Sequence, residues 1–192
     1  MAILRRRIRY PAAAAVVLSL LLPALGAAQP AVPTEYQVKA AFLYNFAKFV
    51  EWPIPASPDA NAVFSIGILG QDPFSADLEA VVRDQTVQGK PLIIKRARRL
   101  QDLGACQILF VASSEQDRLR SILDNVPRGV LTVGDEMPQF TAAAGMIVLM
   151  RKGKYVRFAI NVDAADRAGL KISSKLLNLA VIVHDPQAAG ER

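Results

Sequence analysis

The sequence predicts an α/β protein: a three-layer, Rossmann-like sandwich built on a mostly parallel sheet. The main observation is that short apolar runs alternate with helix-like segments between residues 63 and 133. Such alternation is typical of parallel strands joined by crossover helices. The second observation is a pair of strand-like runs on either side of Lys152-Gly153-Lys154. This pattern indicates a hairpin that adds an antiparallel part to the sheet near the C-terminus.

Residues 1–28 have the pattern of a secretory signal peptide. Four arginines between residues 5 and 9 precede the apolar run 12–22, and small residues before Ala28 suit a cleavage site. The apolar run is shorter than the roughly 20 residues that a membrane-spanning helix needs. We therefore expect an exported protein that does not span the membrane after cleavage, with residues 29–192 forming a single domain. An uncleaved membrane anchor is the alternative.

The basic charge of the full chain comes largely from this leader. The chain has 23 Lys and Arg against 17 Asp and Glu, and removing the four leader arginines leaves 19 against 17. A nearly neutral domain does not support binding to nucleic acid. One basic cluster remains between Lys95 and Arg99. A solvated strand end is a more ordinary explanation for it than a phosphate or partner site.

The first helix is expected over residues 35–51, buried on most sides and stopped by Trp52-Pro53. At about 100° per residue its apolar side chains share one broad arc, and Phe46 lies within that arc. Lys39 also falls inside the arc. One explanation is a pair with Glu35 one turn earlier, with the lysine stem snorkelling to solvent. The other is a buried cation that meets an anionic ligand or a partner carboxylate.

The next elements follow from turn residues and apolar runs. After a Pro- and Ala-rich loop over 53–61, we expect a buried strand at 63–69. Asp72 suits a helix N-cap and Pro73 the first helical position, so a helix should continue from there to Val82.

The second half of the chain continues the alternation. Strands are predicted at 91–95, 107–112 and 130–133. Ser114 and Asp117 resemble a capping box that opens a helix ending near Leu123. The hairpin strands are expected at 146–151 and 155–160, and the segment 164–183 is predicted to be helix with a break near Gly169.

The sequence contains no recognised catalytic motif. His184 is the single histidine, so a Ser-His-Asp triad or a His-rich zinc site lacks the residues it needs. Neither a Gly-x-Ser-x-Gly elbow nor a Walker loop occurs. Cys106 is the single cysteine, which rules out an internal disulfide and favours a buried thiol over an intermolecular disulfide. We expect no enzymatic activity, no cofactor and no metal site.

A candidate ligand crevice lies at the carboxyl ends of the predicted strands, where open α/β sheets bind ligands. Those ends carry Gly70, Asp72, Ser114 and Asp135. Helix N-termini at this edge would favour an anion or a small polar ligand. Caps and turns explain the same residue types without a ligand, so both explanations stay open.

A protein contact is the other kind of site that the composition allows. Exposed apolar residues mark such surfaces, and aromatic residues are enriched in interface cores. Tyr44, Trp52 and Tyr155 are the candidates. The alternative for each is a place in the core of the domain itself.

Two segments resemble the YfiR family. The first is Tyr36–Pro53, and the second is Arg157–Ala180, with its Phe-x-Ile-Asn, Ala-Gly-Leu-x-Ile-Ser and Leu-Leu-x-Leu-Ala pieces. Between them, three generic strand segments occur in the expected order. The sequence departs from the family pattern in two ways. A single cysteine cannot form the internal disulfides that stabilise the best-studied family member, and the glycine pair that often precedes the hairpin strand is Ala144-Gly145 here.

The resemblance implies a periplasmic α/β sandwich, homodimeric and without enzymatic activity. It further implies that the protein binds the periplasmic sensor domain of an inner-membrane diguanylate cyclase and represses it, which keeps cyclic di-GMP and biofilm formation low. The second hypothesis is a periplasmic small-molecule-binding protein that passes a signal to a membrane sensor kinase or cyclase.

Overall fold

The strands of the main sheet are spread along most of the chain in the computed structural model, which describes residues 32–52 and 62–185. They are β2 (Phe64–Leu69), β3 (Thr86–Val87), β4 (Lys90–Ala97), β5 (Ile108–Val111), β6 (Leu131–Asp135), β7 (Ile147–Lys152), β8 (Tyr155–Asn161) and β10 (Val181–Val183). Within the described residues β1 (Val50–Glu51) and β9 (Lys171–Ile172) form a separate antiparallel pair. The predicted signal peptide lies outside the described residues.

The helices are short after the first one. They are α1 (Glu35–Phe49), α2 (Asp77–Val82), α3 (Leu100–Leu103), α4 (Leu119–Asp124), α5 (Val162–Arg167) and α6 (Ser174–Leu177), with a 3₁₀ helix η2 (Ser113–Arg118) before α4. The side chains of Thr34 and Gln37 form a capping box at the start of α1, which satisfies backbone donors that the first turn leaves free.

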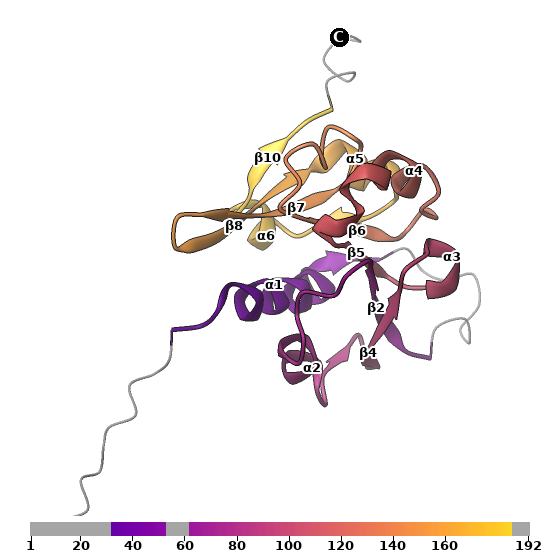
Figure 1. Ribbon diagram of the computed structural model, residues 1–192, viewed down its shortest axis with the longest axis vertical. Coiled ribbons are helices and arrows are strands. Elements are labelled where there is room, and N and C mark those ends of the chain that lie inside the picture. Colours follow the sequence, from indigo (N-terminus) through magenta and orange to yellow (C-terminus); the bar gives the residue numbers. More distant parts are fainter. Residues whose placement is uncertain (1–31, 53–61, 186–192) are drawn as a thin grey trace, which may run out of the picture. The chain divides into compact units, whose positions relative to one another are not determined.

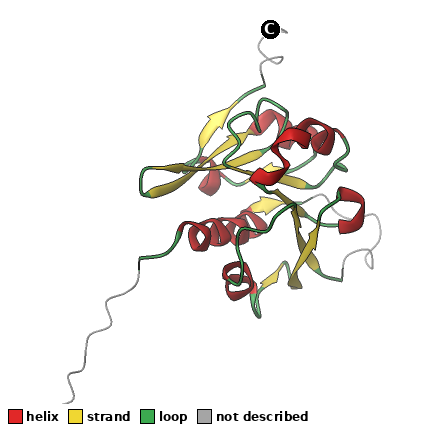
Figure 2. Cartoon of the chain, viewed as in Figure 1, coloured by secondary structure: helices red, strands yellow, loops and turns green. Residues whose placement is uncertain are grey.

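The sheet has the strand order β10-β8-β7-β6-β5-β2-β4-β3 (Figure 1, Figure 2). From β7 to β4 all neighbouring strands are parallel, and β8 pairs antiparallel with β7. The predicted mostly parallel, Rossmann-like sheet with an antiparallel hairpin is therefore confirmed. The order places β5 and β4 on opposite sides of β2, so the strand order reverses between β2 and β5.

Alternating side chains of the strands feed two cores, one on each face of the sheet. In β5, Ile108 and Phe110 join the core under α1 and α2, whereas Leu109 and Val111 join the core under α3 and α4. This is the expected period of two for strands covered on both faces. On the α1 side, Phe46 is fully buried and packs edge-to-face on Phe158 at 5.3 Å.

Two predicted helix caps are wrong because their side chains are used elsewhere. The Asp72 carboxylate accepts a 2.8 Å hydrogen bond from the Phe74 backbone N–H and pairs with Arg96 at 2.6 Å, so it forms a turn, and α2 begins only at Asp77. The Ser114 hydroxyl accepts from the Gln71 backbone N–H at 3.0 Å. It therefore fastens the turn after β2, while η2 starts without a side-chain cap.

The predicted C-terminal helix over 164–183 is also wrong in part. The break near Gly169 is present, since this glycine follows α5 with φ +77°. Beyond it the chain forms β9, the short α6 and β10 instead of a continuous helix. Tertiary pairing decides this outcome, because β9 pairs with β1 and β10 pairs in parallel with β8.

A crowded turn precedes β7. The Phe140 ring lies against Gly134 and Gly145, where an added Cβ would come within 2.4 Å and 2.2 Å of ring carbons. Both positions therefore need glycine. Ala144 next to this contact has φ +68°, in the left-handed region that glycine adopts readily.

Ala144→Gly is expected to stabilise the protein by roughly 0.5–1 kcal/mol. An L-residue in the left-handed region costs about 1–2 kcal/mol, and the extra freedom of glycine in the unfolded chain offsets part of that gain. Urea denaturation would measure the change. Ala143→Gly is the matched control, because Ala143 is not among the residues with positive φ, and it should lose about 0.5–1 kcal/mol. Destabilisation by both variants would contradict the prediction.

Candidate functional site

A buried ion cluster joins α1 to the carboxyl end of β6. The fully buried Lys39 ammonium lies 2.5 Å from a carboxylate oxygen of Glu35 and 2.6 Å from one of Asp135. Glu136 contributes a third carboxylate at 3.1 Å, and the Tyr36 hydroxyl donates a 3.3 Å hydrogen bond to Asp135. The expected pair with Glu35 is present, but the ammonium does not snorkel to solvent. It meets a carboxylate of its own chain.

Charge and hydrogen bonding outweigh burial in setting the protonation of this cluster. Burial opposes the charged form of Lys39, but hydrogen bonds to Asp135 and Glu35 outweigh it and raise the pKa of Lys39 above its ordinary value. Burial likewise opposes ionisation of Glu35, yet hydrogen bonding and charge from Lys39 lower the pKa of Glu35. Lys39 and Glu35 are therefore both charged at neutral pH.

The lowered pKa of Glu35 predicts acid sensitivity. A carboxylate whose folded pKa lies below its unfolded pKa stabilises the fold above the unfolded value, and this contribution is lost as pH falls through the folded one. Wild type should therefore lose more stability than Glu35→Gln between pH 6 and about pH 3, a range that spans the ordinary carboxyl pKa values. Urea midpoints at both pH values would measure the two losses. Equal losses would contradict the role of Glu35.

The four residues of the predicted crevice are engaged within the chain. Gly70 and Ser114 do come together at the switch between β2 and β5, where an added Cβ on Gly70 would lie 2.6 Å from the serine oxygen. Ser114 and Glu115 thus occupy the space above the strand end. Asp72 is held by Arg96, and Asp135 by Lys39. The structure therefore provides internal partners for the side chains of Asp72, Ser114 and Asp135.

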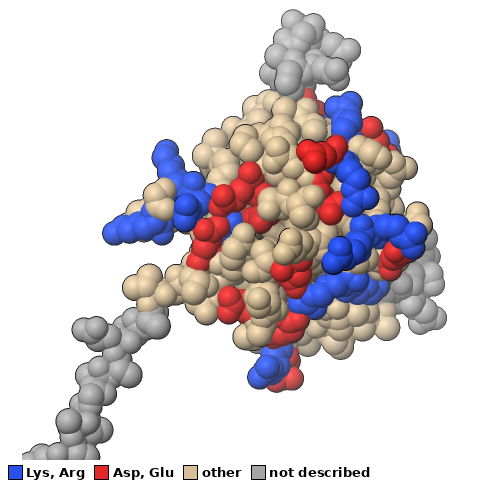
Figure 3. Space-filling view, in the orientation of Figure 1, with Lys and Arg blue, Asp and Glu red and all other residues tan. Residues whose placement is uncertain are grey.

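The three candidate contact aromatics lie in different surroundings. Tyr44 is half-buried and donates a 2.6 Å hydrogen bond to the Gln85 side chain. Trp52 is half-buried and packs edge-to-face on Phe64 at 5.2 Å. Tyr155 is 55% exposed on the β7–β8 hairpin, where basic side chains gather beside acidic ones (Figure 3).

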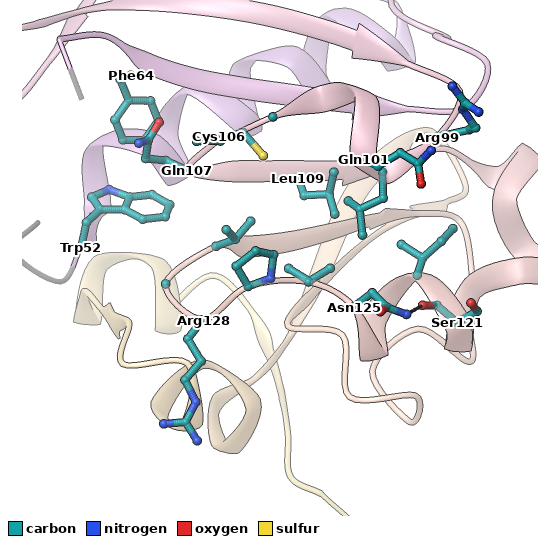
Figure 4. A pocket seen from close by; sticks show the side chains of 18 of the residues that line it. Trp52, Phe64, Arg99, Gln101, Cys106, Gln107, Leu109, Ser121, Asn125 and Arg128 are labelled. Carbon is teal, nitrogen blue, oxygen red and sulfur yellow. Dashed lines mark hydrogen bonds between the residues drawn. The ribbon is translucent and has the colours of Figure 1, made fainter. Parts of the chain in front are cut away.

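A groove of about 1260 Å³ opens on the face of the sheet that carries α3 and α4 and reaches Trp52 and Phe64, which pack in the other core (Figure 4). It arises because these helices have only four and six residues, so they cover that face thinly. Figure 4 shows Trp52, Cys106 and Leu109 along one side of the groove, with Arg128 and Asn125 along the other. Sequence reasoning missed this groove. Its one signal in the sequence is that no helix is predicted between the strands at 91–95 and 107–112, and only a short one ending near Leu123 before the strand at 130–133.

A second unpredicted feature is an apolar edge at β10. Leu179, Val181 and Ile182 are 66%, 58% and 42% exposed. β10 pairs with β8 on one side and ends the sheet on the other, so its outer backbone groups have no strand partner within the described residues. We call these three residues the β10 edge.

The described part of the chain does not bring together side chains that could bind a metal ion. Across residues 32–52 and 62–185, no three side chains of His, Cys, Asp and Glu converge as a metal site would require. His184 is exposed and lies 3.2 Å from Asp163. A search of the same residues for a helix of membrane-spanning length and apolarity finds none.

These features define a Rossmann-like α/β protein with a groove on one sheet face and an apolar sheet edge. The model of the YfiR/HmsC-like family matches residues 36–181, so the chain belongs to this family. Membership supports a regulatory role in the periplasm. No curated protein matches the sequence.

Comparison with solved structures finds the same fold. A crystal structure of a conserved domain protein from Vibrio cholerae is similar, with a TM-score of 0.50 and 11% sequence identity. The match covers 78% of this chain and 60% of that chain. At this identity the likeness shows the fold alone.

Proposed function

We propose that the protein is a non-catalytic periplasmic regulator that binds the periplasmic sensor domain of an inner-membrane diguanylate cyclase and represses it. Repression would lower cyclic di-GMP and biofilm formation. The observation that carries this proposal is the family match over residues 36–181, which includes both end motifs of the sequence. Residues 1–28 serve as the export signal, and residues 29–192 act as one domain.

The β10 edge is the contact surface that the geometry favours. Three exposed apolar side chains next to an unpaired strand edge suit a protein partner, because such a strand can both bury apolar area and add backbone hydrogen bonds. Tyr155 lies at the start of β8, four residues before the Ala159 that pairs with Val181 of β10, and is a separate exposed candidate on the hairpin. Tyr44 and Trp52 are more strongly packed onto the core and are second candidates. We also propose a homodimer, which sedimentation would test.

Cellular cyclic di-GMP tests the proposal. Deletion of the gene should raise cyclic di-GMP, and the exported protein should restore the low level. Ile182→Asp should fail to restore it, because a charge in an apolar contact is costly to desolvate. Ala80→Asp, an exposed apolar-to-acidic change on α2, is the matched control and should restore it. An unchanged level after deletion would contradict repression of a cyclase.

The second candidate function is a small-molecule-binding protein that passes a signal to a membrane sensor kinase or cyclase. The groove beside Cys106 and Leu109 favours this candidate, since ligand sites are concave and mostly apolar. The predicted crevice at Gly70, Asp72, Ser114 and Asp135 is a weaker location because its polar groups already have partners within the chain.

A further inference from the structure

The groove combines an apolar floor with basic side chains. Its lining includes Leu100, Leu109, Ile122, Val126 and Val130. Leu109 belongs to the core under α3 and α4, and the half-buried Val126 packs against that core. The floor of the groove is therefore formed by apolar side chains of this core that the two short helices do not cover. Burial of such a surface by a ligand is favourable in proportion to the apolar area removed from water.

All charged residues along the described groove lining are cationic. They are Lys90, Arg99, Arg118 and Arg128. Arg99 is paired with Asp102, and Arg118 with Glu115, whose carboxylates lie outside the lining. No ion pair joins Lys90 or Arg128 to another described residue. Figure 4 shows Arg99 and Arg128 towards opposite ends of the groove.

We propose that this groove binds an anionic amphiphile: a molecule with an apolar body and a carboxylate, sulfate or phosphate head. The apolar body would lie over Leu109 and Ile122. The head would lie near Arg128 or Lys90, since these cations lack a described ionic partner. The absence of Asp and Glu from the described lining disfavours cationic amphiphiles of the same length. This inference does not depend on the proposed repression of a cyclase.

Matched amphiphiles of opposite charge test the proposal. Decanoate and decyltrimethylammonium share an apolar tail, and each can be titrated into the purified exported protein below its micelle concentration by calorimetry. Decanoate should bind saturably and decyltrimethylammonium should bind at least about threefold more weakly, the effect of one unfavourable surface charge interaction. Equal affinities, or no binding of decanoate, would overturn the proposal.

Cys106 provides a second readout inside the groove. This half-buried thiol lines the groove and is the single cysteine of the sequence, so alkylation by neutral iodoacetamide reports on one place. Burial raises the pKa of Cys106, and the assay should therefore be run at mildly alkaline pH. Bound decanoate should slow alkylation severalfold, and decyltrimethylammonium at the same concentration should slow it clearly less, in proportion to its weaker binding. Protection by neither compound, or equally by both, would contradict occupation of this groove.

Charge reversal locates the head of the ligand. Arg128→Glu should weaken decanoate binding by roughly three- to tenfold, because it replaces an attraction near the surface by a repulsion. Arg120→Glu is the matched control on α4, where Arg120 pairs with Asp124 at 3.4 Å and does not line the groove. Equal weakening by both variants would show general surface electrostatics and overturn the site.

Discussion

Lys39→Met is expected to lower the free energy of unfolding by about 3–5 kcal/mol, the usual cost of removing one partner from a buried ion pair. Methionine retains much of the apolar stem but leaves the Asp135 carboxylate, whose side chain is 2% exposed, without its cation. The Tyr36 hydroxyl at 3.3 Å is too weak a donor to replace it. Thermal and urea denaturation would measure the loss, with a fall in Tm of roughly 6–20 °C.

Two further variants separate the buried pair from general effects on α1. Lys48→Met changes an exposed lysine on the same helix and should cost no more than about 1 kcal/mol, the upper range for its exposed cation–π contact with Tyr44. Lys39→Met with Asp135→Asn should recover part of the loss, because the second change removes the uncompensated charge. A double variant as unstable as the sum of the single variants would argue against coupling between the two residues.

Phe46→Ala is expected to cost about 3–5 kcal/mol through the cavity that the lost ring leaves. The Phe46 side chain is fully buried between α1 and the sheet, with ring centroids of Phe42 and Phe158 at 6.1 Å and 5.3 Å. Neighbouring groups cannot close such a space fully, because the core is close-packed. Urea denaturation of the purified protein would measure the loss.

Tyr155→Ala is the matched control for an aromatic deletion. Its ring is 55% exposed and contacts the cations of Lys154 and Arg157 at 5.4 Å and 5.5 Å. Its loss should cost about 0.5–1 kcal/mol, the range for an exposed cation–π contact. An unchanged denaturation midpoint for Phe46→Ala would contradict the assignment of α1 to the core.

Much of the fold could be predicted because local patterns encode it. Apolar periodicity predicts a helix over 35–51, and α1 spans Glu35–Phe49, with Val50–Glu51 forming β1. The strands β2, β5 and β6 follow from apolar runs, and the β7–β8 hairpin follows from Gly153 between two such runs. Each of these signals depends on residues within one or two turns of each other, which is the range that propensity and periodicity describe.

The predictions that failed depend on partners far away in the chain. The sequence predicts Asp72 as a helix cap and Ser114 as part of a capping box, but Arg96 pairs with Asp72 and the backbone N–H of Gln71 donates to Ser114. The helix predicted to reach residue 183 gives way to β9 and β10, because Ile172 pairs with Val50 and Val181 with Ala159. Local propensity is a weak prior when a sheet edge offers such pairing.

The candidate site was less predictable than the fold. The sequence marks Lys39 as an unusual charge on an apolar arc, but its partner Asp135 lies 96 residues away, and the sequence indicates only that Asp135 is a carboxylate at a strand end. The groove depends on how little of the sheet α3 and α4 cover, which follows from packing of several segments. The β10 edge depends on which strand ends the sheet.

By itself the sequence determined the α/β class, the apolar periodicity of α1, the hairpin and the family resemblance, since all of these are carried by neighbouring residues. Only the tertiary structure decided the strand order, the pairing of β1 with β9, the burial of Lys39 against Asp135 and the positions of the groove and the β10 edge. The two end motifs show the reason: they meet through Val50 and Ile172, a contact that closes a long loop and is encoded in neither segment alone.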